Sequence, residues 1–448
     1  MHARQLCTDR RLQSEDILMS SSRTIASKSA LSLGTIAKVL LVLAACLLAE
    51  RVPRSLYADF RANPADLFCD FNYYLYAFTK VLQHPGDLSQ LYDHDALVAF
   101  LRSMGARNTG EDVFYGYPPQ FALLFSPLAR LSPLAAKAVW ALGSVVLFGA
   151  GVAMLAKLAY RGENRAVPLL IVAIALLSRP LLDDFYLGQS NELLFFLIVA
   201  TFFFIDRGNH FLAGLFLGTA IVLKVTPLAI AGLLLLRREW RTAIATAVTS
   251  LAITAFTAWQ LGLQVMLHYL VSDMPRLNAQ NLLLGGAPAN NSLRGAVQAL
   301  SKFAGMSPSQ SVLGAIWLAT AVVVCGIAVV LVYRQHADRR IDFALACTTM
   351  LVASPMLEPV HLVALLIPLA VLFGTTLEWS ETRLSAIGPR VELVLASCAV
   401  LILFFRARNV GYFAAVSIVY ALCLARYFAP LAAAQRGHWQ GISAGGRS

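Results

Sequence analysis

The chain has 448 residues, of which 58% are apolar or aromatic and only 14% are charged. A soluble protein usually carries about 25% charged residues, so this composition excludes a soluble globule. The formal net charge is +11, but the basic residues stand in short segments between apolar blocks rather than along one stripe, which argues against a nucleic-acid partner.

Apolar blocks of roughly the 20 residues that a helix needs to cross a bilayer recur along the whole sequence. The mean hydropathy of the chain is +0.66. We therefore expect an all-α polytopic membrane protein with about 12 transmembrane helices and with further helices in its external loops.

The first predicted span covers about residues 35–50 and follows a basic N-terminal segment, residues 1–34. Because basic residues mark the cytoplasmic side of a membrane protein, this segment is predicted to be cytoplasmic. The polar residues 51–117 then form a first external loop. Apolar residues at about 135–159, 167–181 and 192–205 predict the next spans. An external turn between the last two carries Asp183 and Asp184, for which a solvated turn is favoured over a metal pocket.

Residues 211–236 allow two interpretations. One continuous helix would place Lys224 at mid-membrane, at a cost of roughly 2.5–3.5 kcal/mol. Two short helices hinged at Lys224–Pro227 avoid this cost, and Pro227 disfavours helix at the residue before it. We predict the hinge.

The remaining spans are predicted at about 243–260, 312–333, 342–356, 362–376, 391–405 and 412–429, with a second large external loop at 261–311 and a cytoplasmic tail at 431–448. This topology places Arg406 and Arg408 outside, against the charge rule. It also places most of the unusual polar residues on one external face, where loops on a rigid scaffold commonly carry binding groups.

Six motifs follow one another along the chain, namely Asp70-Phe-Asn-Tyr-Tyr, Tyr117-Pro-Pro, Gly188-Gln-Ser-Asn191, Gly214 to Pro227 with Lys224, Asn291-Ser-Leu, and Ser354-Pro with His361. In order and spacing they resemble glycosyltransferase family 87. The resemblance implies a GT-C type transmembrane domain over residues 35–430, in the inner membrane of a bacterial cell. It also implies a hexosyltransferase that uses a polyprenyl-phosphate sugar as donor, of which mannose is the favoured sugar, and a glycan or glycolipid acceptor. Apart from the donor no cofactor and no metal ion is expected. Many relatives have a Trp and paired histidines after the Ser-Pro motif, whereas here only His361 matches.

The resemblance implies that Asp70 is the general base of an inverting transfer. A carboxylate beside the membrane surface can accept the proton of the acceptor hydroxyl, which contributes roughly 10²–10⁴-fold to the rate. A loop-solvating or helix-capping aspartate is the alternative.

Lys224 is the main candidate for binding the departing phosphate, since it is a point charge beside a helix break. A lysine that extends from a helix end to the interface is the alternative interpretation. His361 could contact phosphate or sugar, or cap a helix. Arg179 is a further cationic candidate. The other candidate substrate-binding residues are Arg294, Gln189, Asn191, Asn291 and Tyr117, although Asn191 could equally cap a helix and Tyr117-Pro-Pro could be structural.

Two other functions remain open. A lipid-linked-sugar transporter or flippase would carry ionisable residues inside its spans and show inverted halves, neither of which is clear here. A polymerase or ligase would be expected to rely on external arginines and histidine rather than on an aspartate in the first loop.

Overall fold

The computed structural model of the chain describes residues 32–83, 88–110, 113–277, 279, 290–334, 338–382, 387–405 and 410–444. Within these ranges the regular structure is helical and no strand occurs. The predicted N-terminal segment 1–34 falls almost wholly outside the described residues, and so do Arg406 and Arg408.

The first half of the fold is built from one long helix, a group of short helices and then a run of apolar helices. In chain order these are α2 (Leu33–Ala62), η1 (Pro64–Asp66), α3 (Phe71–Gln83), α4 (His94–Ser103), α5 (Pro119–Phe125), η2 (Ser126–Arg130), α6 (Pro133–Ala159), α7 (Ala166–Leu177), α8 (Arg179–Leu187), α9 (Asn191–Asp206), α10 (His210–Leu223) and α11 (Leu228–Leu236).

The second half of the described residues is also helical. Its elements are α12 (Trp240–Leu261), α13 (Leu263–His268), the π-helical turn η3 (Tyr269–Asp273), α15 (Leu293–Phe303), α16 (Gln310–Tyr333), α17 (Arg339–Val352), η4 (Pro359–Leu365), α18 (Leu366–Thr382), α19 (Ile387–Phe404) and α20 (Val410–Ala444).

Serine caps begin three of the long apolar helices, α2, α6 and α16. Ser32 Oγ accepts from the Thr35 amide at 3.1 Å before α2, and Ser309 Oγ accepts from the Val312 amide at 3.3 Å before α16. Ser132 caps α6 in the same way and is followed by Pro133, a residue that suits the first position of a helix. The caps satisfy amide groups that have no partner inside the helix, so each helix starts at a defined residue.

Among the residues that the structure describes, six helices are long and apolar enough to span a membrane, and the count is seven if α7 and α8, which bend by 51° at their junction, form one broken span. The chain is therefore a multi-pass membrane protein. The prediction of about 12 spans is not confirmed, because several predicted spans, such as α9 and α10, are helices of only 16 and 14 residues.

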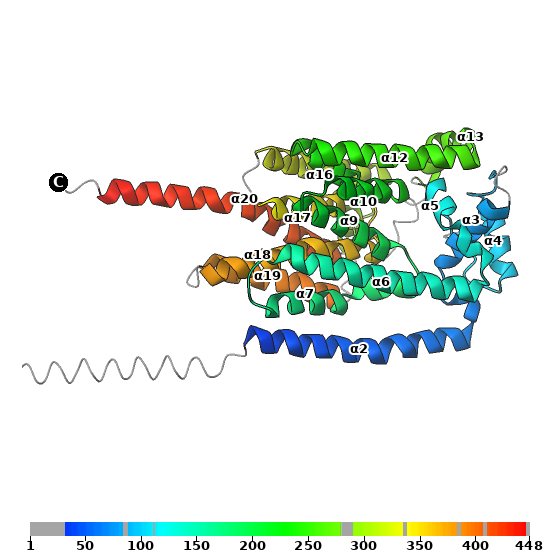
Figure 1. Ribbon diagram of the computed structural model, residues 1–448, viewed down its shortest axis with the longest axis horizontal. Helices are drawn as coiled ribbons and strands as arrows, with labels where there is room; N and C mark the ends of the chain where they lie inside the picture. Colours follow the sequence, from blue (N-terminus) through cyan, green and yellow to red (C-terminus); the bar gives the residue numbers. More distant parts are fainter. Residues whose placement is uncertain are drawn as a thin grey trace, which may run out of the picture.

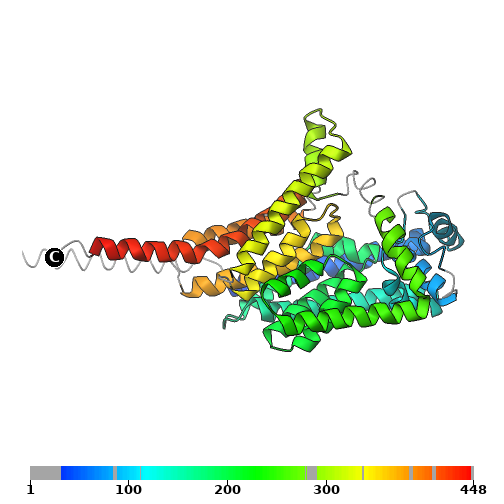
Figure 2. The same cartoon turned by 90° about the horizontal axis from the view of Figure 1, so that it is seen from above.

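The apolar helices run side by side, and the small helices α3, α4, α5 and α13 gather at one end of the bundle (Figure 1). α2 lies along the side of the bundle and packs mainly on α7. α16 leans out of the bundle and contacts α15 (Figure 2). Its side chains Val322 and Val323 are 63% and 58% exposed, as expected for a lipid-facing helix.

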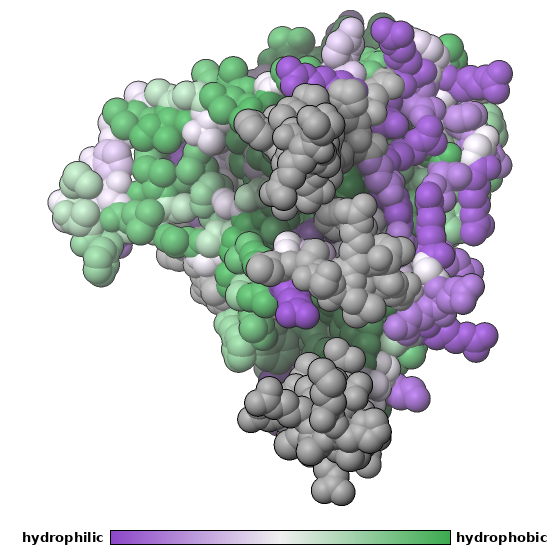
Figure 3. Space-filling model, turned by 90° about the vertical axis from the view of Figure 1, so that its left-hand side faces the viewer, coloured by the Kyte–Doolittle hydropathy of each residue, from purple (hydrophilic) through white to green (hydrophobic). Residues whose placement is uncertain are grey.

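The opposite end of the bundle carries the loops that join α6 to α7, α9 to α10 and α11 to α12. These loops and the first turns after them hold exposed arginines, among them Arg161, Arg165, Arg207, Arg238 and Arg241. Seen from this end, hydrophilic side chains lie along one side of the molecule and hydrophobic ones along the other (Figure 3).

Two glycines bring α10 against α12. A Cβ atom on Gly214 would stand 2.3 Å from the Cβ of Ala245, and one on Gly218 would stand 2.7 Å from the Thr246 carbonyl oxygen. This is the close approach that glycines four residues apart permit between membrane helices. It supports the helix that ends at Lys224.

The hinge predicted at Lys224–Pro227 is confirmed. α10 ends at Leu223, Lys224 has extended backbone angles, and α11 begins at Leu228. Pro227 immediately precedes α11, so the residue that disfavours a continuous helix also starts the second one.

Two helices continue beyond the segments predicted to span the membrane. α2 extends from the predicted end of the first span at residue 50 to Ala62, and the ion pair of Glu50 with Arg54 at 2.5 Å lies on this extension. The predicted first loop 51–117 therefore begins inside α2. At the other end of the chain, α20 extends to Ala444 through residues that favour helix, so most of the predicted tail 431–448 is helical.

Candidate active site

Asp70 stands at the start of α3, in a short loop that crosses the end of α8. Its backbone amide donates to the Leu187 carbonyl at 2.9 Å. Two residues earlier, the backbone of Phe68 has a φ of 52°, in the left-handed region that residues other than glycine rarely adopt. The loop is thus held in a specific shape against α8, and that shape positions the Asp70 carboxylate.

Lys137 and Trp140 of α6 fix the two segments that meet at Asp70. Lys137 Nζ donates to the Ala65 carbonyl at 2.7 Å, which holds the approach to the Asp70 loop. Trp140 Nε1 donates to the carbonyls of Gly188 and Gln189 at 3.0 and 3.2 Å. One face of α6 therefore sets the relative positions of the Asp70 loop and the α8–α9 turn.

Gln189 connects Asp70 to a group of buried aromatic hydroxyls. Its Nε2 donates to Asp70 Oδ2 at 2.6 Å, and its Oε1 accepts from the hydroxyl of Tyr74 at 2.7 Å and that of Tyr117 at 3.3 Å. Because the amide oxygen serves two hydroxyl donors, the amide nitrogen must face the carboxylate. Ser190 Oγ completes the group by donating to the Tyr117 hydroxyl at 2.8 Å.

The surroundings of Asp70 favour a carboxyl group that can exchange a proton near neutral pH. Burial raises the pKa of Asp70 to about 7, against a lowering effect of the Gln189 hydrogen bond, and the charge of Glu358 raises it further. Burial also raises the pKa of Glu358, whereas the charge of Lys224 lowers it. A general base works best when its pKa is close to the ambient pH, so Asp70 suits that task.

A second polar group forms where the α10–α11 hinge meets the start of α9. Lys224 Nζ donates to Asn191 Oδ1 at 3.0 Å, and Asn191 Nδ2 donates to Asp184 Oδ1 at 2.5 Å. The Lys224 ammonium also lies 5.8 Å from the ring centroid of Tyr117. Tyr117 therefore contacts both the Gln189 group and the cation.

Lys224 and Asn191 share a small cavity of about 70 Å³ with His361. His361 Nδ1 accepts from the Glu358 amide at 3.3 Å, so the histidine also caps the start of η4. Both interpretations made for His361 from the sequence are thus compatible with its position.

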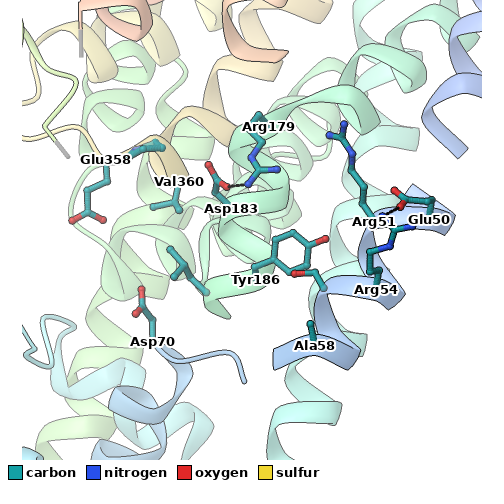
Figure 4. A pocket seen from close by; sticks show the side chains of 13 residues that line it. Glu50, Arg51, Arg54, Ala58, Asp70, Arg179, Asp183, Tyr186, Glu358 and Val360 are labelled. Carbon is teal, nitrogen blue, oxygen red and sulfur yellow. Dashed lines mark ion pairs between the residues drawn. The ribbon is translucent and has the colours of Figure 1, made fainter. Parts of the chain in front are cut away.

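Asp70 lines a second, larger cavity of about 980 Å³ (Figure 4). Glu358 lies directly before η4 and Val360 in its first turn, and Arg179, Asp183, Tyr186 and Leu187 come from α8. Five further lining residues come from α2, and those after residue 50 were expected in the first external loop rather than in a helix. The lining residues on α2 are Glu50, Arg51, Arg54, Ser55 and Ala58.

The structure brings together most of the residues singled out in the sequence, but not all. Asp70, Gln189, Tyr117, Asn191 and Lys224 form a connected polar group, and His361 lines the cavity next to it.

Asn291 and Arg294 lie elsewhere. The Asn291 amide donates to the Leu357 carbonyl at 2.7 Å and so supports the segment before η4. Arg294 of α15 donates to Gln310 of α16, and it lines neither of the two cavities described above.

One interpretation made from the sequence is wrong. Asp183 and Asp184 are 9% and 0% exposed inside α8 rather than in a solvated turn, because Arg179 pairs with Asp183 and Asn191 with Asp184.

The aromatic residues after Asp70 belong to the core of the fold. Tyr74 is 2% exposed and packs against Trp140 with ring centroids 5.7 Å apart.

Sequence reasoning missed the contribution of α2. Arg51 and Arg54 stand one turn apart directly after an apolar run, and this spacing was the available signal that the helix continues past the membrane surface with a polar face.

The model of the family described as glycosyltransferase family 87 matches residues 114–355, which is more than half of the chain. The chain belongs to glycosyltransferase family 87. The matched region contains Tyr117, Gln189, Asn191 and Lys224, whereas Asp70 and His361 lie on either side of it.

Curated relatives of this family 87 chain come from mycobacteria. A polyprenol-phosphate-mannose-dependent alpha-(1-2)-phosphatidylinositol mannoside mannosyltransferase of Mycobacterium tuberculosis is 34% identical over 166 residues, which is 34% of this chain and 38% of the relative. The protein of the same description from Mycolicibacterium smegmatis is 32% identical over 154 residues, or 32% of this chain and 34% of the relative.

A further relative in Mycolicibacterium smegmatis is described as a pentamannoside mannosyltransferase of the same type. It is 28% identical over 198 residues, or 43% of this chain and 46% of the relative. The chain thus spans less than half the length of each of these relatives.

Proposed function

We propose that the chain is a membrane hexosyltransferase that moves a sugar, with mannose favoured, from a polyprenyl-phosphate carrier to a hydroxyl group of a glycan or glycolipid acceptor. The observation that carries the proposal is the Asp70 carboxylate. It lines a large cavity, is oriented by Gln189, and has a pKa near 7. The printed descriptions of the mycobacterial relatives name a polyprenol-phosphate-mannose donor and a phosphatidylinositol mannoside acceptor, which supports the same donor class and a lipid-linked acceptor here.

In the proposed mechanism Asp70 accepts the proton of the acceptor hydroxyl as its oxygen attacks the anomeric carbon of the donor. The bond between that carbon and the phosphate oxygen breaks on the opposite face, so the configuration inverts. The polyprenyl phosphate leaves with the bonding electron pair. Lys224, held by Asn191, is the cation for the departing phosphate.

Gln189 and Tyr117 keep the base and the cation in a fixed relation in this mechanism. Gln189 contacts Asp70 directly, and Tyr117 lies between Gln189 and Lys224. Groups that are already oriented before the reaction need little rearrangement as charge develops. We further propose that these residues belong to one transmembrane domain, residues 35–430, of which 51–117 and 261–311 supply the helices at the Asp70 end.

We also propose that the Asp70 end of the bundle faces away from the cytoplasm, in a bacterial inner membrane with both termini inside. The exposed arginines of the loops at the other end support this orientation, since cytoplasmic loops are rich in Arg and Lys. A phosphatase reporter fused at residue 90 or 358 is expected to be active outside the cell. A cytoplasmic signal from both fusions would reverse the orientation.

The decisive experiment is transfer activity of purified, folded Asp70→Asn protein with polyprenyl-phosphate sugars. Loss of a general base is expected to lower the rate by roughly 10²–10⁴-fold. Asp95→Asn is the matched control, because Asp95 is an exposed aspartate on the neighbouring α4 and does not line the cavity. Full activity of the Asp70 variant would refute the assignment of the base.

A further inference from the structure

The large cavity has two chemically different walls. Asp70 and Glu358 lie on one side, and three arginines lie on the other, Arg51 and Arg54 on α2 and Arg179 on α8 (Figure 4). The side chain of Tyr186 stands between the two helices that carry the arginines. The cationic wall is separate from Lys224, which lines the smaller cavity.

The arginines retain donors that the protein does not use. Arg54 pairs with Glu50 at 2.5 Å, and Arg179 Nη2 pairs with Asp183 at 2.9 Å. The Arg179 Nε atom, however, is buried without a hydrogen-bond partner. Among the described residues, the Arg51 guanidinium has no hydrogen-bonding or ion-pair partner, and it is exposed on the cavity side of α2. Because the Arg179 Nε–H is a buried donor without a partner, an anion beside it would be favourable, and the exposed guanidinium groups of Arg51 and Arg54 can donate further hydrogen bonds to the same anion.

A small apolar crevice of about 20 Å³ adjoins the cavity at two of these arginines, so it can accommodate only part of a hydrocarbon chain. Arg51 and Arg179 belong to the lining of both spaces. The crevice runs between α2, the α7–α8 pair and α19, and its apolar lining residues are Ala44, Leu47, Leu48, Leu176, Leu177, Leu182 and Phe404.

The helix that forms one side of the crevice faces hydrocarbon. Val39 and Val42 of α2 are 59% and 62% exposed, and they precede the crevice residues on the same helix. A hydrocarbon chain in the crevice would therefore lie at the depth of the bilayer, with its polar end directed to the arginines.

We propose that Arg51 and Arg179, with Arg54 beside them, bind the phosphate group of a long-chain lipid substrate whose hydrocarbon chain runs along this crevice into the surrounding bilayer. The proposal rests on the proposed function, because it places one lipid reactant with its polar end in the cavity that Asp70 lines. Two reactants carry this chemistry, namely the polyprenyl phosphate of the donor and the phosphate of a phospholipid-linked acceptor. The planar guanidinium groups suit a phosphate better than an uncharged head group, since each can donate two parallel hydrogen bonds to phosphate oxygens.

The test is direct lipid binding by the purified full chain in a neutral maltoside detergent, measured by titration in native mass spectrometry. The probes are undecaprenyl phosphate and dioleoyl-phosphatidylinositol, with undecaprenol and dioleoylglycerol as uncharged counterparts. Arg51→Gln and Arg179→Gln are each expected to weaken binding of a phosphate-bearing probe about 10- to 100-fold, and to leave the uncharged probes unchanged. Arg51→Lys should restore part of the loss. Arg61→Gln is the control, since Arg61 is an exposed arginine on α2 that does not line the cavity.

A variant of the crevice tests the position of the chain. Leu48 is only partly buried, so Leu48→Trp is expected to fold and to fill the crevice. It should weaken undecaprenyl phosphate binding and leave the short-chain geranyl phosphate unaffected.

The outcomes separate the two lipid sources. Weakened binding of undecaprenyl phosphate alone assigns the arginines to the donor and moves the phosphate contact away from Lys224. Weakened binding of phosphatidylinositol alone assigns them to the acceptor. Unchanged binding of both lipids in the Arg51 and Arg179 variants, or an equal loss in Arg61→Gln, would overturn the site. None of these measurements needs turnover, so a failure here leaves the Asp70 proposal standing, and inactivity of the chain leaves the binding result standing.

Discussion

Replacement of Gln189 tests whether Asp70 is the group that must lose a proton before transfer. Gln189→Leu removes the amide that donates to Asp70 Oδ2 at 2.6 Å, a hydrogen bond that lowers the pKa of this carboxyl. A hydrogen bond to a charged group contributes about 1.5–3 kcal/mol. Since 1.36 kcal/mol corresponds to one pKa unit, the pKa of Asp70 should rise from about 7 by about one to two units.

A base acts only when deprotonated, so the rate should increase with pH through the pKa of Asp70. At pH 7 about half of the Asp70 carboxyls are ionised in the unmodified protein, and about 1–10% would be ionised in Gln189→Leu. The rate at pH 7 should fall roughly 5- to 50-fold, and part of it should return at higher pH.

The assay is kcat/KM for sugar transfer from a radiolabelled polyprenyl-phosphate sugar between pH 5 and 10. Glu358→Gln provides a change of opposite sign, because the charge of Glu358 raises the pKa of Asp70. Its profile should shift to lower pH, by less than the Gln189 variant shifts upward. A Gln189→Leu profile that keeps its midpoint, or that moves to lower pH, would refute the reasoning.

Three further substitutions have defined outcomes. Lys224→Met should lower kcat while it changes the melting temperature only slightly, and Lys224→Arg should retain part of the activity. An unchanged kcat in Lys224→Met would show that Lys224 does not bind the departing phosphate. Gly188→Ala should lower the melting temperature and the transfer rate, because Gly188 has a φ of 72° and its new Cβ would stand 2.8 Å from that of Phe68. Gly143→Ala is the control, since no atom lies within 4 Å of the added Cβ and the site is helical; it should stabilise the protein by roughly 0.5–1 kcal/mol. Gly214→Ala should separate α10 from α12 and lower the melting temperature, and unchanged stability would show that the helices adjust freely.

The hinge at Lys224 could be predicted because its cause is local. A lysine inside an apolar run makes a continuous membrane helix unfavourable, and a proline three residues later disfavours helix at the residue before it. Both effects act within one helical turn. The helix ends at Ala62 and Ala444 could not be set by the same reasoning. Hydropathy marks where a helix leaves hydrocarbon rather than where helical hydrogen bonding stops, and both helices continue into polar sequence.

The contact between Asp70 and Gln189 joins residues 119 positions apart, and no local pattern predicts such a pair. The family resemblance placed both residues among the candidates without saying that they touch. The burial of Asp184 depends in the same way on Asn191, which reaches back across the α8–α9 turn to supply a hydrogen bond. Without knowledge of this hydrogen bond, two adjacent aspartates in a sequence predict a solvent-exposed turn.

The crevice beside α2 is lined by apolar side chains, and other apolar side chains of α2, such as Val39 and Val42, are exposed to hydrocarbon. A substrate that uses it would diffuse in the plane of the bilayer and never pass through water. The quantity that saturates the protein would then be the mole fraction of that lipid in the membrane rather than its amount per volume of solution. Dilution of the bilayer with inert lipid should therefore slow the reaction, whereas dilution of the whole vesicle suspension with buffer should leave turnover per protein unchanged.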